Sequence, residues 1–149
     1  MGDYEMKKIF YIFIPILLQC CICSSDCDID NIVESTWISQ GRKSFELDFS
    51  ISMPFEWDTM YYISSRCSID KIQETFGYIP FDFVDTAEYI LFFKKNKLVY
   101  VQKWYLFPAK NKKGVTFEIE EPIKKFCLAN SVFSVNRINQ IFVLHPIKH

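Results

Sequence analysis

The segment Glu88–Tyr105, EYILFFKKNKLVYVQKWY, sets the architecture of this chain. It consists of two apolar, aromatic runs, 88–93 and 98–105, on either side of the polar segment Lys94-Lys95-Asn96-Lys97. Asparagine tolerates the positive φ that a tight hairpin turn requires. The sequence therefore predicts a β-hairpin here, and this hairpin is its strongest structural signal.

Further strands are predicted on both sides of this hairpin. Residues 45–51 alternate apolar and polar side chains, a period of two that is typical of a strand with one buried and one wet face, and Pro54 ends the pattern. Residues 115–120 repeat the alternation after a polar turn at 110–114. Further, less regular strand patterns occupy 59–63, 132–135 and 141–144.

A short helix is predicted between the strands. Ser68 is a good N-cap, and Ile69, Ile72 and Phe76 fall on one side of a helix that begins after it. Gly77 supplies the left-handed residue on which helices commonly end. We therefore expect an α+β fold: a single domain with an antiparallel sheet of about five to seven strands and one or two helices on one face.

The N-terminus has the order of an export signal. Two lysines within Met6–Lys8 precede an apolar run, Ile9–Leu18, which is followed by a cysteine-rich and serine-rich segment. The run is too short for a transmembrane helix, which needs about 20 apolar residues. We divide the chain into an export signal (1–25), a tether (26–36) and one α+β domain (37–149).

The residues around Cys21 resemble a bacterial lipobox, because Leu18 lies three positions before it and the small Cys20 immediately before it. Cys21 is the expected lipidation site, with Cys20 and Cys23 as alternatives. The serine-rich and acid-rich stretch 24–28 resembles the tether that follows the acylated cysteine in many such lipoproteins. Ordinary signal cleavage before Asp26, which would give a periplasmic or secreted soluble protein, is the alternative.

A wider resemblance covers about residues 45–135. Phe55-Glu56-Trp57-Asp58 with the strand after it, the helix that closes on Phe76-Gly77, and the strands on either side of the charged turn resemble a family of small, uncharacterised, Bacteroidetes-like lipoproteins. The helix-then-hairpin order is also similar, more distantly, to envelope assembly lipoproteins and to inhibitor domains. The resemblance implies a small domain at the cell envelope and no particular reaction.

The sequence contains no catalytic, phosphate-binding or metal-binding motif, so we expect neither an enzyme nor a cofactor or metal. An enzyme would need a buried cleft around Glu56, Asp58 or His145, with a perturbed pKa. Three tryptophans, Trp37, Trp57 and Trp104, are expected in the core rather than in a sugar site. For Cys67 and Cys127, a disulfide and two small buried side chains are equally good interpretations.

Charge is unevenly divided along the chain. Residues 24–93 hold 4 Lys or Arg and 13 Asp or Glu, a net of −9, whereas residues 94–149 hold 11 and 3, a net of +8. The simpler explanation is that neighbouring strands pair their exposed charges. The functional one is a basic docking face that includes Lys94, Lys95, Lys97 and Lys103, with Lys110, Lys112 and Lys113 beyond them; in an exported protein it would address an acidic protein or envelope surface, not nucleic acid.

These observations predict an exported, lipid-anchored envelope protein that binds an envelope or secreted protein, for example as an immunity or inhibitor module. An accessory structural role in envelope assembly and an enzyme with an unrecognised site are the alternatives. The sequence leaves the oligomeric state open.

Overall fold

The predicted hairpin is present in the structure, a computed structural model that describes residues 27–105 and 114–147, as β3 (Ala87–Lys94) and β4 (Lys97–Tyr105). The two strands pair from Ala87↔Tyr105 to Lys94↔Lys97, with a bulge between Phe92 and Phe93. Lys95 and Asn96 form a two-residue turn with φ of 48° and 62°. Positive φ at both central residues is the geometry of a type I′ hairpin turn.

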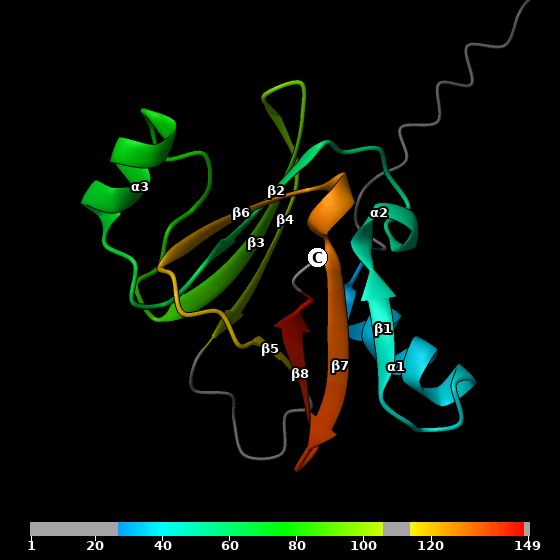
Figure 1. The fold of residues 1–149 in the computed structure, drawn as a ribbon. Coiled ribbons are helices and arrows are strands. Elements are labelled where there is room, and N and C mark those ends of the chain that lie inside the picture. The colour runs from blue at the N-terminus through cyan, green and yellow to red at the C-terminus, as the bar shows by residue number, and fades with distance from the viewer. Residues whose placement is uncertain (1–26, 106–113, 148–149) are drawn as a thin grey trace, which may run out of the picture.

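The fold is α+β, as predicted, but its strands form two four-stranded sheets (Figure 1). The first sheet has the order β4-β3-β2-β6, where β2 is Thr59–Ile63 and β6 is Ile123–Cys127. The second has the order β1-β7-β8-β5 and is made of Phe45–Asp48, Val132–Ile138, Ile141–Pro146 and Gly114–Phe117. All pairs are antiparallel except β5 with β8.

The larger core cluster joins the facing sides of the two sheets. Ile90 and Phe92 of β3 share it with Phe133 of β7 and Leu144 of β8, and all four are fully buried. The opposite face of β3 presents Leu91 to a second cluster. Because β3 is buried on both faces, its sequence is a continuous apolar run rather than an alternating one.

The predicted tether, residues 26–36, is corrected by the structure for residues 29–36, which belong to helix α1 (Ile29–Ser39). Asp28 caps this helix by accepting a hydrogen bond from Asp30 N at 3.0 Å. Ile29 and Val33 are fully buried in the larger cluster. The acid-rich start of this segment is thus a helix N-terminus, where Ser and Asp are also common, and the helix belongs to the folded domain.

The predicted strand 45–51 is wrong in its second half. β1 ends at Asp48, which accepts a hydrogen bond from Ser50 N at 2.8 Å and caps the single turn α2 (Phe49–Ser52). Phe49 is fully buried while Ile51 is 82% exposed. Phe49 would be buried in a continued strand and is also buried in this turn. Ile51, which a continued strand would have buried, is left in solvent by the turn.

The helix predicted after Ser68 is confirmed as α3 (Ile69–Phe76). Ser68 Oγ accepts a hydrogen bond from Lys71 N at 3.3 Å, and Gly77 ends the helix at φ +78°. Its Ile72 is buried in the second cluster, whereas α1 packs into the first, so the two longer helices belong to different clusters. A 3-10 turn, η2 (Leu128–Asn130), connects β6 to β7.

Candidate functional site

Strand β4 is an edge strand of the first sheet. Its side chains alternate between half-buried and exposed along all nine residues. Of the half-buried ones, Tyr100, Gln102 and Trp104 lie toward the space between the sheets, whereas Leu98, beside the bulge, packs against the second cluster. Val99, Val101 and Tyr105 are 36%, 41% and 50% exposed. A long edge strand with an apolar exposed row is a template for pairing with another strand.

Two acidic side chains fix the turn at the end of this edge. Asp58 Oδ2 accepts a hydrogen bond from Lys95 N at 2.7 Å, and this bond lowers the pKa of Asp58. Glu56 Oε2 lies 3.5 Å from Lys94 Nζ. Among the ion pairs formed between described residues, this is the one that joins the acidic and basic halves of the chain.

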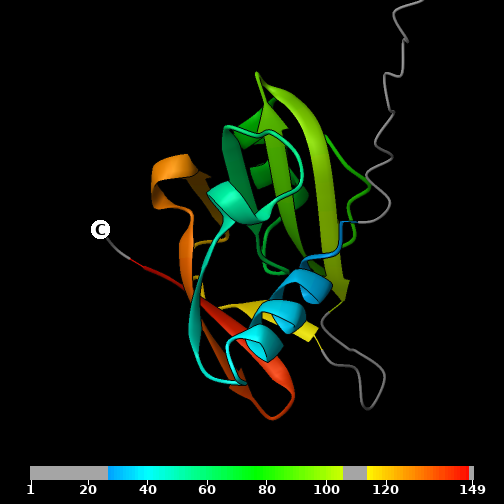
Figure 2. The same ribbon diagram turned by 90° about the vertical axis from the view of Figure 1, so that its right-hand side faces the viewer.

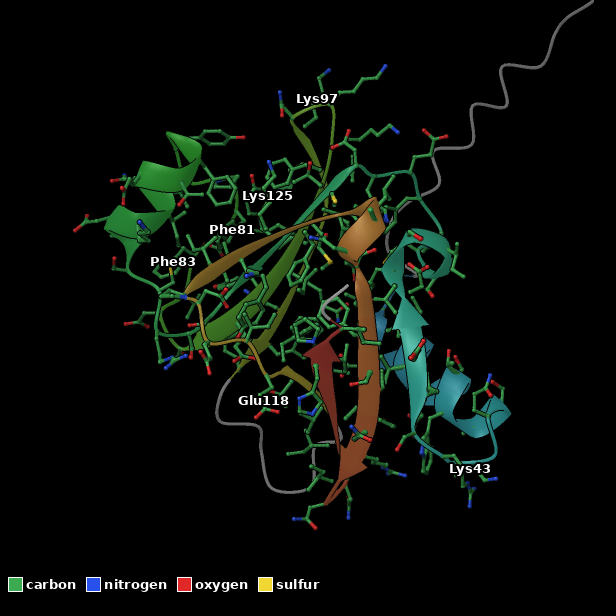
Figure 3. The ribbon with its side chains drawn as sticks, in the orientation of Figure 1. Lys43, Phe81, Phe83, Lys97, Glu118 and Lys125 are labelled. Carbon is green, nitrogen blue, oxygen red and sulfur yellow. The ribbon has the colours of Figure 1, made fainter. Side chains whose placement is uncertain are left out.

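The predicted basic face lies along the hairpin as a row rather than as a compact patch. Lys94, Lys95 and Lys97 surround the turn, and Lys97 projects from the tip (Figure 3). Lys103 lies six residues further along β4, about 20 Å from Lys97 at the usual rise of a strand. Its Nζ lies 5.4 Å from the Tyr105 ring centroid. Lys110, Lys112 and Lys113 lie outside the described residues.

A polar cluster holds the first described residues against the inner face of β4. Tyr100 donates a hydrogen bond to Cys27 O at 2.7 Å, and Gln102 Oε1 accepts one from Ile29 N at 2.8 Å. Asp30 Oδ2 accepts from Trp104 Nε1 at 2.7 Å and from Gln102 Nε2 at 2.9 Å. Burial raises the pKa of Asp30, against the effect of the Trp104 hydrogen bond. The sequence shows none of this cluster, because its members are about 70 residues apart.

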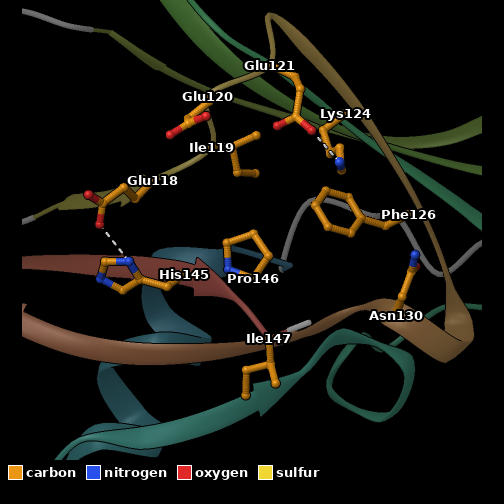
Figure 4. Close-up of a pocket in the computed structure, with 10 residues that line it drawn as sticks. All are labelled: Glu118, Ile119, Glu120, Glu121, Lys124, Phe126, Asn130, His145, Pro146 and Ile147. Carbon is orange, nitrogen blue, oxygen red and sulfur yellow. Dashed lines mark hydrogen bonds and ion pairs between the residues drawn. The ribbon is translucent and has the colours of Figure 1, made fainter. Parts of the chain in front are cut away.

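The pocket in Figure 4 has a volume of about 770 Å³ and lies beside the connection from β5 to β6 and the end of β8. His145 Nδ1 lies 2.6 Å from Glu118 Oε2, and Lys124 pairs with Glu121. Glu120 and Asn130 are also on its wall. Its described lining residues include no Ser, Thr or Cys.

The three residues considered as candidates for an enzymatic site do not form one site in the structure. Glu56 and Asp58 support the β3–β4 turn, whereas His145 lies on β8 in the pocket just described. The three tryptophans contact aromatic rings of the core: Trp37 with Phe142, Trp57 with Phe92, and Trp104 with Phe117. The region of the chain that the structure describes contains no group of three metal-binding side chains.

The disulfide, one of the two interpretations of Cys67 and Cys127, does not form in the structure. Cys67 and Cys127 are both free thiols. Cys127 pairs with Thr59 at the start of β2, whereas Cys67 lies beyond Ile63 at its other end, where it is buried in the second cluster. Cys67 therefore fits the alternative interpretation of a small core side chain, and Cys127 is exposed. The lipidation candidates Cys20, Cys21 and Cys23 lie outside the described residues.

Comparison with protein-family models, with curated proteins and with solved structures gave no match. Within residues 27–105 and 114–147, no helix is long and apolar enough to cross a membrane.

Proposed function

We propose that this chain is an exported, lipid-anchored envelope protein that binds another protein through the edge strand β4, without catalysing a reaction. An immunity or inhibitor module is the concrete form of this proposal. The observation that carries it is the edge itself: nine residues, an exposed apolar row, and lysines at the tip and near the far end.

Strand addition is the binding mode that suits such an edge. A partner strand that pairs with β4 gains main-chain hydrogen bonds, and its side chains meet those of Val99 and Val101. β4 contains Lys97 and Lys103 but no acidic residue. Directly opposed opposite charges stabilise a strand pair and like charges destabilise it. These lysines therefore favour an acidic, partly apolar partner strand and disfavour a second copy of β4.

Lipid anchoring rests on the N-terminal sequence. Cys21 precedes Cys27, whose carbonyl is bonded to β4, by six residues. Six residues span at most about 20 Å. An acyl chain on Cys21 would therefore hold the domain close to the membrane, and β4 would meet its partner there.

Capture of the partner tests the docking surface. The tagged full chain is used to isolate envelope proteins, and Lys97→Glu with Lys103→Glu is the test variant. Lys71→Glu, on exposed α3, is the control for charge reversal elsewhere. We expect the double variant to lose its partner at low salt and the control to retain it, because exposed charges attract one another most strongly there. At physiological ionic strength the attraction is screened over about 8 Å. Equal capture by all three chains would contradict docking through β4.

Acyl labelling tests the anchor separately. Cys21→Ser should abolish the label and release the chain from the membrane fraction, whereas Cys127→Ser, at an exposed thiol of the domain, should change neither. Labelling that persists in Cys21→Ser moves the site to Cys20 or Cys23. An unlabelled native chain contradicts lipid anchoring.

A further inference from the structure

Two loops meet at the end of the molecule opposite the β3–β4 tip. One follows α1 and the other is the β7–β8 turn, and both lie at the bottom in Figures 1 and 2. Figure 3 shows Lys43 at this end and Lys97 at the other. Residues 39–45 and 136–142 contain Arg42, Lys43 and Arg137 and no acidic residue. The nearest carboxylates along the chain are Glu34 on α1 and Glu46 on β1.

The first loop is fixed by the way α1 ends. Gly41 N donates to Ile38 O at 3.1 Å, and Arg42 N donates to Trp37 O at 2.8 Å. These two bonds, with φ of +70° at Gly41, form a Schellman motif. The motif turns the chain back over the helix, so that Arg42 Cζ lies 5.8 Å from the Trp37 ring centroid.

The second loop brings another guanidinium to the same indole. Arg137 Cζ lies 4.2 Å from the Trp37 ring centroid and 5.3 Å from that of Phe142. Trp37 and Phe142 are themselves in edge contact, with ring centroids 5.7 Å apart. Among the described residues, neither Arg42 nor Arg137 forms an ion pair with a carboxylate. Within the part of the chain that the structure describes, both guanidiniums thus lack a carboxylate partner and can pair with an external anion.

Apolar side chains surround these charges. Ile138 and Ile141 are paired at the tip of the β7–β8 hairpin, whose turn residues Asn139 and Gln140 have φ of 50° and 76°. Ile138, Ile141 and Ile38 of α1 are 55%, 39% and 54% exposed. Interfacial surfaces bind lipid by burying apolar side chains and by attracting anionic headgroups to basic ones. The exposed isoleucines and the neighbouring cations offer both kinds of contact.

We propose that this end of the molecule, which we call the Trp37 end (Trp37, Ile38, Arg42, Lys43 and the hairpin tip 137–141), docks on an anionic phospholipid surface. The cations contact lipid phosphates, and the isoleucines and Trp37 enter the headgroup region. The inference goes beyond the proposed function: it adds a membrane contact made by the folded domain. It also gives the domain an orientation, with the β3–β4 tip directed away from the lipid.

Trp37 is the natural reporter of this contact. The full chain is bound to vesicles of phosphatidylcholine, with or without phosphatidylglycerol, whose acyl chains are brominated to quench nearby tryptophans. The difference between the native chain and Trp37→Phe isolates Trp37 from Trp57 and Trp104. We expect Trp37 to be quenched on anionic vesicles, and the quenching to disappear in about 1 M salt, where the screening length is about 3 Å.

Arg42→Gln with Lys43→Gln is the test variant, because Arg137 also packs on the core rings. A basic residue near an anionic surface contributes about fivefold to binding, so the docking constant should fall about 25-fold. Lys95→Gln with Lys97→Gln, at the opposite hairpin, is the matched control and should leave Trp37 quenching unchanged. Circular dichroism of each variant verifies the fold.

Three results would overturn the inference: equal Trp37 quenching on neutral and anionic vesicles, quenching that the Arg42 and Lys43 changes leave intact, or a shift in oligomeric state caused by these changes, which would make this end a contact between two copies. Partner capture depends on Lys97 and Lys103 instead. Failure of the lipid contact and failure of the β4 proposal are therefore seen in different variants.

Discussion

Phe92 and Val99 lie on the two arms of the same hairpin, and the structure predicts very different consequences when each is truncated to alanine. The Phe92 ring is fully buried and contacts Phe49, Phe55, Trp57 and Tyr100, at centroid distances of 6.0, 5.4, 5.1 and 6.1 Å. Phe→Ala in a core costs about 3–5 kcal/mol. Four ring contacts exclude the lower end of this range, so we expect Phe92→Ala to cost about 4 kcal/mol.

Val99 follows a different expectation because it is 36% exposed beside the β-bulge. From the sequence, both residues of this apolar hairpin are expected to enter the core; the structure corrects this for Val99. Val99→Ala should cost about 0.5 kcal/mol, the usual range for a surface change. It is therefore the matched control for a truncation within the same hairpin.

Urea unfolding, followed by far-ultraviolet circular dichroism on a chain that begins at Asp26, measures both values. With a slope of about 2 kcal/mol per molar urea, Phe92→Ala should lower the midpoint by about 2 M, and Val99→Ala by a few tenths of a molar. Total stabilities of such domains are about 5–15 kcal/mol, so a loss of about 4 kcal/mol is readily measured. Equal losses in the two variants would refute the placement of Phe92 between the sheets.

Three further predictions concern single positions. Burial raises the pKa of Asp30 in the folded state, so the free energy of unfolding should fall as pH rises from the ordinary aspartate pKa through the raised one. Unfolding curves of Asp30→Asn across this pH range should show a smaller fall. An equal pH dependence in the native chain and the variant would contradict a raised pKa at Asp30. Cys127, which is exposed, should be alkylated before Cys67, whose burial raises its pKa, and a Cys67–Cys127 cross-linked peptide from the native protein would contradict the free-thiol structure. Gly77→Ala should lower the free energy of unfolding by about 1 kcal/mol because Gly77 ends α3 at φ +78°, and Gly77→Asn should lower it less. Equal thermal stability of Gly77→Ala and the native chain would contradict this and would show that this end of the helix relaxes.

Local patterns in the sequence determined those elements whose signals are complete within a few residues. The Lys95-Asn96 turn, the Ser68 cap and the Gly77 stop are such signals, and the hairpin and α3 follow them closely. The same reasoning failed at 49–51, where an alternating pattern continued past the strand, because Asp48 caps a helical turn as readily as it sits on the wet face of a strand. It failed again at 29–36, where the acidic residues indicated a tether although Ile29 and Val33 already had the spacing of a helix face.

The long-range arrangement was decided only by the tertiary structure. The local sequence distinguishes β4, an edge strand, from β3, which is buried on both faces, only in part: both runs are apolar and aromatic, although β4 also contains Gln102 and Lys103. The lysines of the expected docking face were identified from the sequence, but their row along an open edge depends on which strands occupy the other side of β3. Likewise, Trp37, Arg42 and Arg137 form one surface only because β1 pairs with β7, which places the end of α1 beside a turn almost 100 residues later. Sequence patterns report each segment's own preference, whereas strand order and loop proximity follow from how the whole chain buries its apolar surface.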